Sequence, residues 1–239
     1  EICTNWAKGK PEYDNLFNDV KNVYDAWRPY AKGRVYLNEG IFGSPLIGFA
    51  SALKELDDAL LNPASGQKEI DKSLAGVKGG YDRFIKGENI ISDRNILATV
   101  LKMYNTDVEA SQQPTAFYTW LKNTYGDLSK DETYQKYAKD VFDNTFLLDK
   151  EKWSAFVAKP DSALLHKDPA FKTAMAFVKN FNNNYKKYFT EFTANNYGLN
   201  NKYLKGVLEM KKGTAMYPDA NFTMRVSYGN VKSYSPKDA

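Results

Sequence analysis

The sequence contains one histidine, His166, so a Ser-His-Asp arrangement built from this chain alone would have to use it as the base. His166 stands in Leu-Leu-His-Lys-Asp-Pro, directly before the helix-start signal Asp168-Pro169. This position is typical of an exposed loop residue, and we expect His166 to lie on the surface. The sequence also lacks the Gly-x-Ser-x-Gly elbow that positions the nucleophile in many hydrolases.

Gly43-Ser44-Pro45 is the other stretch that invites a catalytic interpretation, because similar tripeptides often surround a nucleophilic serine. It directly precedes an apolar helical pattern. In that position Ser44 is a good N-cap and Pro45 is a good first helical residue. We therefore interpret this stretch as the start of a helix.

Other residue patterns with chemical potential are also incomplete. The paired carboxylates Asp57-Asp58 and Asp131-Glu132 fall on polar faces of predicted helices, and we expect them to be solvated charges. The glycine-rich stretch 76–80 lacks the preceding strand that a dinucleotide site requires. One cysteine and one histidine cannot form a zinc site of the usual kind. The residues alone give no catalytic set, and we expect no cofactor and no metal.

The sequence predicts that the elements that would position a site are mainly amphipathic helices, since apolar residues recur at steps of three and four. Pro11 suits the first turn of the first helix, and Arg28-Pro29 ends or kinks it. Ser92 and Asp131 are the predicted N-caps of two later helices. We expect an all-α body, overwhelmingly helical from about residue 10 to residue 212, with helical stretches near 11–27, 46–60, 70–84, 96–104, 117–125, 134–142, 153–157, 171–192 and 204–208.

Near the C-terminus the apolar period changes from about 3.6 residues to 2. Apolar residues there alternate with polar ones, as in a half-buried strand: Phe222, Met224, Val226 and Tyr228. Gly229-Asn230 is a turn signal, and residues 231–234 are a candidate return strand. The predicted fold is therefore an all-α body with a short C-terminal β-strand or hairpin.

Composition and charge exclude several classes of protein. The 33 basic and 29 acidic residues are interleaved and give a net charge of +4, too small an excess to predict a nucleic-acid partner. No apolar run is long enough to span a membrane. Cys3, the only cysteine, cannot form a disulfide within the chain. Aromatic residues make up 15% of the chain, and most fall at helical spacing, so we interpret them as core residues rather than as a sugar- or peptide-binding surface.

One long stretch, 216–229, reads Met-Tyr-Pro-Asp-Ala-Asn-Phe-Thr-Met-Arg-Val-Ser-Tyr-Gly. It resembles the Tyr-Pro-Asp-Ala-Asn-x-Thr-hydrophobic-Arg-x-x-Tyr-Gly signature of the bacterial dipeptidyl-peptidases numbered seven and eleven. Weaker matches to this family occur in the family's order along the chain: Lys10-Pro11-Glu12-Tyr13, Arg28-Pro29-Tyr30 with Tyr36 and Glu39, Ser92-Asp93-Arg94 before Leu101-Lys102-Met103-Tyr104, and Asp168-Pro169-Ala170. The resemblance covers essentially the whole chain.

The resemblance implies a serine-type exopeptidase that releases dipeptides from the free N-terminus of peptides. The family's catalytic part is similar to chymotrypsin, a double β-barrel with a His-Asp-Ser triad, and a large helical domain inserted between the barrel halves caps the active site. Residues 1–213 resemble this cap, and residues 214–239 resemble the incomplete start of the second barrel half. No triad residue carries over to this chain, so none of its residues is expected to be catalytic.

The resemblance also implies where the cap would meet a substrate and where the protein would work. The family's cap contributes an asparagine to the binding of the substrate's N-terminal amine. Asn38, beside Glu39 in Tyr-Leu-Asn-Glu, is the candidate here, although its local pattern favours a plain exposed polar residue of a loop or helix start. The implied partners are peptides with a free N-terminus, the rest of the double barrel and a second copy in a homodimer. The implied location is the periplasm or the bacterial cell surface.

Two alternatives remain open at this stage. The first is an aromatic-rich, helical glycan-binding lipoprotein of the bacterial surface, and the second is a plain helical interaction module. The C-terminal strand favours the peptidase, because a self-contained binding module should not end on a hairpin with an open edge.

Overall fold

The computed structural model describes residues 2–214 and 229–233, and every regular element in these residues is a helix. The expectation of an overwhelmingly helical body is therefore confirmed. The elements are α1 (Ile2–Ala7), α2 (Leu16–Val35), the π-helical turn η1 (Tyr36–Ile41), α3 (Pro45–Ala52), α4 (Lys54–Leu61), α5 (Gln67–Gly87), α6 (Ile90–Asp107), the 3-10 turn η2 (Ala110–Gln112), α7 (Thr115–Tyr125), α8 (Asp131–Asn144), the 3-10 turn η3 (Phe146–Leu148), α9 (Lys150–Ala158), α10 (Ser162–Leu165), α11 (Pro169–Asn184) and α12 (Lys186–Met210).

The C-terminal strand was predicted for residues 222–228, which lie outside the described residues. Residues 229–233 have no regular secondary structure. The predicted return strand is thus not formed over its described part, 231–233, and the described residues contain no hairpin.

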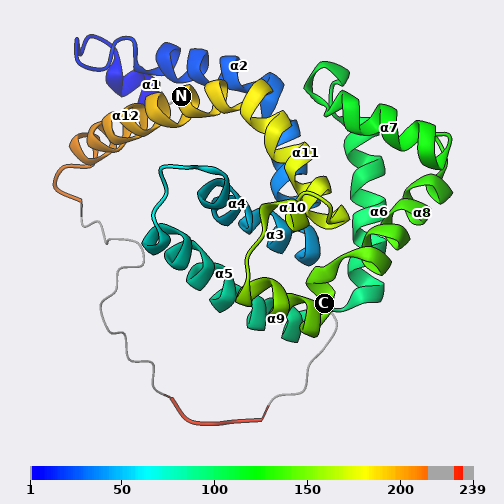
Figure 1. Cartoon of the computed structure of the whole chain (residues 1–239). Coiled ribbons are helices and arrows are strands. Elements are labelled where there is room, and N and C mark those ends of the chain that lie inside the picture. The colour runs from blue at the N-terminus through cyan, green and yellow to red at the C-terminus, as the bar shows by residue number, and fades with distance from the viewer. Residues whose placement is uncertain (1, 215–228, 234–239) are drawn as a thin grey trace.

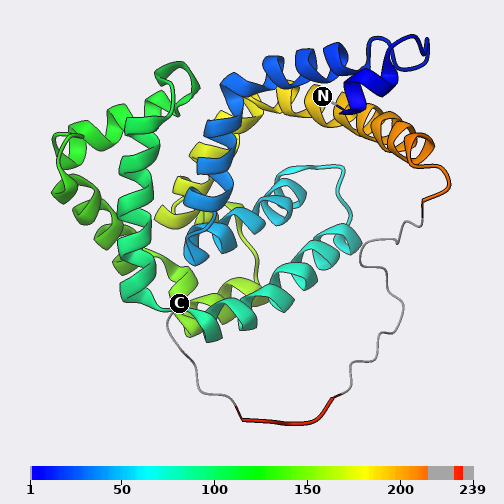
Figure 2. The same cartoon turned by 180° about the vertical axis from the view of Figure 1, so that it is seen from behind.

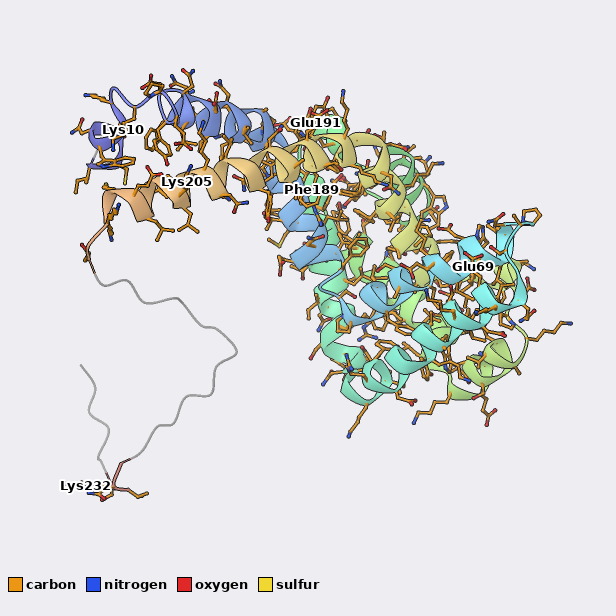
Figure 3. The ribbon with its side chains drawn as sticks, turned by 90° about the vertical axis from the view of Figure 1, so that its left-hand side faces the viewer. Lys10, Glu69, Phe189, Glu191, Lys205 and Lys232 are labelled. Carbon is orange, nitrogen blue, oxygen red and sulfur yellow. The ribbon has the colours of Figure 1, made fainter. Side chains whose placement is uncertain are left out.

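Three helices form an arm that extends from the rest of the molecule. We call α1, the first half of α2, and α12 the arm, and we call the helices α3 to α11 the body. Figures 1 and 2 show the arm helices side by side. Figure 3 shows the arm projecting away from the body, with Lys10 and Lys205 at its far end. The arm has a small core of its own around Ala7, Tyr13 and Leu16.

The body is built around one large core with many aromatic residues. Its tightest ring contacts include Tyr81 stacked on Trp153, with centroids 4.2 Å apart, and Phe49 stacked on Phe84 at 4.6 Å. Among the described residues, the six largest fully buried side chains are all aromatic: Tyr104, Tyr134, Tyr185, Phe156, Phe171 and Phe177. Buried rings contribute both apolar area and favourable ring–ring geometry. The aromatic content is therefore mainly a core property, as predicted.

Several helix boundaries differ from the sequence prediction. The first long helix begins at Leu16 rather than near Pro11, and it continues through Pro29 to Val35. Proline removes one backbone hydrogen bond from a helix interior. Tertiary contacts stabilise the helix on either side of Pro29. Trp27 stacks on an aromatic ring of α12 with centroids 5.4 Å apart, and the side-chain amide of Gln112 donates to the Pro29 carbonyl at 3.1 Å.

The predicted N-caps at Ser92 and Asp131 are also wrong. Asn89 caps α6, and its side chain accepts a hydrogen bond from the Ser92 backbone N–H at 3.0 Å. Lys130 occupies the N-cap position of α8, and Asp131 is the first helical residue. In both cases the predicted cap residue lies inside the first turn of the helix. An acidic or hydroxyl residue in the first turn gives the same sequence signal as an N-cap, so the sequence alone did not distinguish the two positions.

The long helix predicted for 171–192 breaks at Tyr185, where φ is −123°, and α12 then continues through 204–208. Tyr185 is fully buried and its hydroxyl donates to the Gln112 carbonyl at 2.5 Å. A second bond joins the hydroxyls of Tyr185 and Tyr104 at 2.8 Å. The break therefore separates α11, which packs in the body, from α12, which belongs to the arm.

Candidate functional site

The one histidine lies in a polar contact that resembles a catalytic triad in composition but not in geometry. His166 Nε2 lies 2.8 Å from Asp57 Oδ2, and the Ser162 hydroxyl donates to Asp57 Oδ1 at 2.6 Å. A triad needs the imidazole between the hydroxyl and the carboxylate. Here the carboxylate lies between the other two groups, so the imidazole is not placed to take a proton from Ser162. The contact joins α10 to α4.

This contact corrects one expectation and confirms another. The His166 side chain is 55% exposed, as predicted for a surface residue. Asp57 was expected to be solvated, but it is only 5% exposed, because α4 packs against α10. Its position is one helical turn after Leu53, on the same apolar stripe. That spacing is a sequence signal for burial. Asp131 and Glu132 are exposed, as expected.

The predicted substrate residues Asn38 and Glu39 lie on η1, which continues α2 without a break. The turn has π geometry, since the Phe42 backbone N–H bonds to the Leu37 carbonyl five residues earlier, at 2.9 Å. Leu37 and Ile41 are buried, so Asn38 and Glu39 face solvent. π-helical turns are uncommon and frequently mark functional sites.

The polypeptide after η1 turns sharply, and glycine makes this possible. A Cβ on Gly43 would lie 2.1 Å from the Glu39 carbonyl oxygen, and a Cβ on Gly48 would lie 2.6 Å from the Phe42 carbonyl oxygen. Real side chains essentially never approach a backbone oxygen this closely, so only glycine fits at Gly43 without a shift of the backbone. The sequence showed Gly43 only as part of a cap motif.

Helix α6 supports η1 along its length. The Tyr36 hydroxyl donates to the Asp107 carboxylate at the C-terminal end of α6, and this bond together with burial raises the pKa of Tyr36. Gly40 packs against Val100, with 3.6 Å between the Val100 Cβ and a Cβ built on Gly40. Ile96 and Met103 share the helix face of Val100 and are 42% and 44% exposed. An apolar strip on α6 therefore borders the polar outer surface of η1.

Asn38 and Glu39 are free to meet a ligand. Within the described residues, neither side chain forms a hydrogen bond or an ion pair. The site thus combines an amide and a carboxylate with an adjoining apolar strip. This arrangement can accept hydrogen bonds from a cationic amine while a side chain of the same ligand rests on apolar surface. We call the exposed surface of η1 and the α6 strip the η1 surface.

Helix α3 begins directly after the turn that follows η1, and the Ser44 backbone N–H at its start donates to the Gly40 carbonyl of η1. Ser44 is its N-cap and Pro45 its first residue, as predicted. The capping hydrogen bond, however, comes from Asp93, whose Oδ2 accepts from the Leu46 backbone N–H at 2.8 Å. Asp93 is only 2% exposed and lies 47 residues away in the sequence. Sequence analysis missed this role, although Asp93 stands one turn before the buried Leu97.

A second carboxyl group lies beside Asp93. Glu88 sits between α5 and α6, and burial together with the negative charge of Asp93 raises its pKa to about 7. Burial likewise raises the pKa of Asp93, while the Ser44 hydroxyl and the Leu46 N–H act in the opposite direction. Asp93 is linked to η1 through Ser44, whose side chain lies beside Asp93 and whose backbone N–H donates to the Gly40 carbonyl at 3.3 Å.

Asp168 also has a structural role in the body. It is the N-cap of α11, as predicted, and its Oδ1 accepts from the Phe171 N–H at 3.0 Å. Its other oxygen accepts from the Thr145 hydroxyl at 2.8 Å and from the Phe146 N–H at 2.9 Å. Asp93 and Asp168, both in stretches that carried the family resemblance, are thus buried caps rather than reactive carboxylates.

The described part of the chain offers little else for chemistry. Within residues 2–214 and 229–233, no group of three or more His, Cys, Asp and Glu side chains could hold a metal ion. None of the helices in these residues has the length and the apolar character needed to cross a lipid bilayer.

Known proteins match the chain along nearly its whole length. The model of the family Peptidase S46 matches residues 3–239. An Asp/Glu-specific dipeptidyl-peptidase of Flavobacterium psychrophilum is 30% identical over 239 residues, which cover 98% of this chain and 31% of that protein. Dipeptidyl-peptidase 7 of Phocaeicola vulgatus is 30% identical over 241 residues, which cover 97% of this chain and 31% of that protein. The chain spans about a third of the length of these relatives.

The fold matches solved structures from the same group of proteins. The crystal structure of Porphyromonas endodontalis DPP11 in complex with the dipeptide Arg-Glu superposes with a TM-score of 0.62 and 20% identity, covering 93% of this chain and 31% of that one. The same protein in an alternate conformation gives a TM-score of 0.61. This likeness shows a shared fold. Together with the family match over residues 3–239, it establishes that the chain belongs to the peptidase S46 family.

Proposed function

We propose that residues 1–213 are the helical cap domain of an extracytoplasmic serine-type dipeptidyl-peptidase, and that residues 214–239 begin the second half of its catalytic double barrel. The whole protein would release dipeptides from the free N-terminus of peptides. Membership of the peptidase family supports this proposal, as do the names of the relatives and the third of their length that the chain spans. The matches give no support to the glycan-binding alternative.

The observation that carries the proposal is the meeting of the first and last helices at the far end of the arm. Lys205 on α12 pairs with Glu12 at 2.7 Å, and the Cys3 sulfur lies 3.8 Å from the Tyr203 hydroxyl. Gly206 packs so closely on the Tyr13 ring that an added Cβ would lie 3.1 Å from it. A domain inserted within another needs its entry and exit side by side. The arm provides this arrangement.

The role of such a cap is physical. A lid that closes one end of a cleft admits only a short N-terminal stretch of peptide, and it must then satisfy the buried ammonium group, which is costly to leave unpaired. In our proposal the Asn38 amide oxygen and the Glu39 carboxylate of the η1 surface accept hydrogen bonds from this ammonium. The bordering strip of Ile96 and Met103 would contact an apolar part of the substrate.

The bond-breaking step would be acyl transfer by a Ser-His-Asp triad with an oxyanion hole, supplied by the parts of the barrel that carry the triad. The order of groups at Ser162, Asp57 and His166 supports a catalytic triad outside these residues, because the imidazole does not activate the Ser162 hydroxyl. Homodimer formation and a periplasmic or cell-surface location belong to the proposal on the strength of the family resemblance alone.

The proposal is tested with the complete protein from which this chain derives, assayed on a chromogenic dipeptidyl substrate and on its N-acetylated form. We expect hydrolysis of the free substrate only. Asn38→Ala and Glu39→Gln should each lower kcat/KM for the free substrate by roughly 10- to 100-fold, the effect of leaving a charged amine without a partner. Asn123→Ala and Glu132→Gln, at exposed positions on α7 and α8, are the matched controls.

Two results would contradict parts of this proposal in different ways. Equal hydrolysis of the acetylated substrate would rule out recognition of a free N-terminus. Full activity in both η1 variants, with selectivity retained, would leave the cap assignment intact and refute the role of Asn38 and Glu39.

A further inference from the structure

The carboxyl group of Glu88 is buried in an unusual environment. Both of its oxygens are inaccessible to solvent and receive no hydrogen bond from an N–H or O–H donor among the described residues. The same is true of the Asp93 Oδ1 atom. The Glu88 and Asp93 side chains nonetheless meet, with their carboxyl groups within hydrogen-bonding reach of each other. Two carboxyl groups can bond to each other only when one of them carries a proton.

The surroundings decide which group keeps the negative charge. Asp93 Oδ2 accepts from the Leu46 N–H at the start of α3, and Asp93 itself stands in the first turn of α6. Two helix N-termini, each with a partial positive charge, therefore favour the ionised form of Asp93. The Ser44 hydroxyl also lies beside it. Glu88 has no comparable donor, so it is the better place for the proton.

No cation is available to take the place of that proton. Helix α3 contributes no charged side chain to this region. Lys86, at the end of α5, is exposed, and Arg94 lies half-buried on α6. Within the described residues, neither forms an ion pair with Glu88 or Asp93, and neither shifts the pKa of these groups.

We propose that Glu88 and Asp93 share one proton, and that this proton fastens the α5–α6 junction to the start of α3 and so holds the η1 turn in position. Loss of the proton places a second negative charge next to Asp93. The resulting repulsion pushes the Asp93 carboxylate and so weakens its hydrogen bond to the Leu46 N–H, which lies only a few residues beyond η1. The pKa of Glu88, raised to about 7, puts this change within the physiological range.

Glu88 and Asp93 are therefore positioning residues rather than catalytic residues. The proton link itself stands on two buried carboxyl groups that lack donors and lie within hydrogen-bonding reach of each other. Only its effect on substrate binding rests on the proposed function. In a complete peptidase, we expect the η1 surface to be well ordered when the proton is bound and looser when it is lost, so that the KM for a free N-terminus would rise with pH while the triad titrates separately.

The test uses this chain labelled with ¹³C and ¹⁵N, and it needs no enzymatic activity. The Glu88 side-chain carboxyl resonance is followed between pH 4 and pH 9. Exchange of the Leu46 amide is measured over the same range, because this N–H has Asp93 as its partner and reports the cap directly. We expect Glu88 to titrate near pH 7, and we expect protection of the Leu46 amide to fall about tenfold as it does so, after correction for intrinsic exchange.

Glu88→Gln provides the decisive variant, because a glutamine amide can donate to Asp93 at every pH. The fall in Leu46 protection near pH 7 should then be absent, whereas Glu132→Gln, at an exposed site on α8, should behave like the unchanged protein. Titration of Glu88 near its usual pKa would overturn the proposal. So would an unchanged pH dependence in Glu88→Gln. A shift of the Leu46 resonance on addition of CaCl₂ alone would show a cation site instead of a shared proton.

Discussion

Replacing Asp168 with alanine should be among the most damaging single changes in the body of this protein. Asp168 is 4% exposed and accepts three hydrogen bonds that join two segments of the chain. One comes from the Phe171 N–H at the start of α11. The others come from Thr145 and Phe146, which precede and begin η3.

The expected loss follows from these three contacts. Removing an N-cap side chain costs about 1 kcal/mol. The Thr145 hydroxyl and the Phe146 N–H would be left buried without an acceptor, since both residues are at most 6% exposed. Each unsatisfied buried donor costs about 1–3 kcal/mol, so the free energy of unfolding should fall by about 3–7 kcal/mol in total.

The measurement is urea-induced unfolding followed by the circular dichroism of the helices. Asp149→Ala is the matched control, because Asp149 caps α9 by accepting from the N–H groups of Glu151 and Lys152 at an exposed site. Water can replace an exposed cap, so this variant should lose much less stability. Asp168→Asn keeps one carbonyl oxygen and should fall between the two. If Asp168→Ala lost no more stability than Asp149→Ala, the buried contacts of Asp168 would not be a source of stability.

Four further outcomes are expected. Gly33→Ala should destabilise the fold by about 1–3 kcal/mol, because its Cβ would lie 2.8 Å from the buried Tyr185 hydroxyl. Gly79→Ala, where the added Cβ would face open space on α5, should instead raise the free energy of unfolding by up to about 1 kcal/mol. Thermal unfolding of both variants compares them. The unfolding free energy should fall by about 1–2 kcal/mol, after allowance for solvent screening, as pH rises from about 4.5 to about 7. The reason is that folded Glu88 keeps a proton that the unfolded chain releases, and a smaller fall over this range in Glu88→Gln checks the assignment. The chain alone should hydrolyse no dipeptidyl substrate, and fluorophosphonate-sensitive turnover by the purified chain would refute this. Truncation after Gly213 should reduce self-association measured by light scattering, because the four apolar residues predicted on one strand face are then absent, and equal association of the two forms would argue against the strand prediction.

Much of the fold was decided by local sequence patterns. Apolar spacing at three and four residues sets which stretches are helical, because a one-sided apolar stripe can be buried only by a helix of that period. The starts of α3 at Ser44-Pro45 and of α11 at Asp168-Pro169 were predictable for the same local reason. The sequence also predicted that His166 would lie at the surface, since that conclusion needed only a count of residue types and their local context.

Other features depended on contacts between distant segments, which no local pattern encodes. Asp93 caps α3 from 47 residues away, and Asp57 is buried because α10 packs over it. Helix α2 continues through Pro29, where ring packing on α12 and a hydrogen bond from Gln112 stabilise the helix from outside. Tyr185 breaks a long apolar pattern because its hydroxyl finds buried partners in the body.

The candidate site likewise has features that the sequence predicted and features that only tertiary packing determines. The identities of Asn38 and Glu39 were available from the sequence, and their role in binding stays a prediction. Their exposure, the π geometry of η1 and the apolar strip beside it were not available, because they arise where α6 packs against η1 through Gly40 and Val100. Local spacing sets which face of a helix is apolar. Which polar groups that face meets, and at what pKa, is settled only when distant elements exclude water between them.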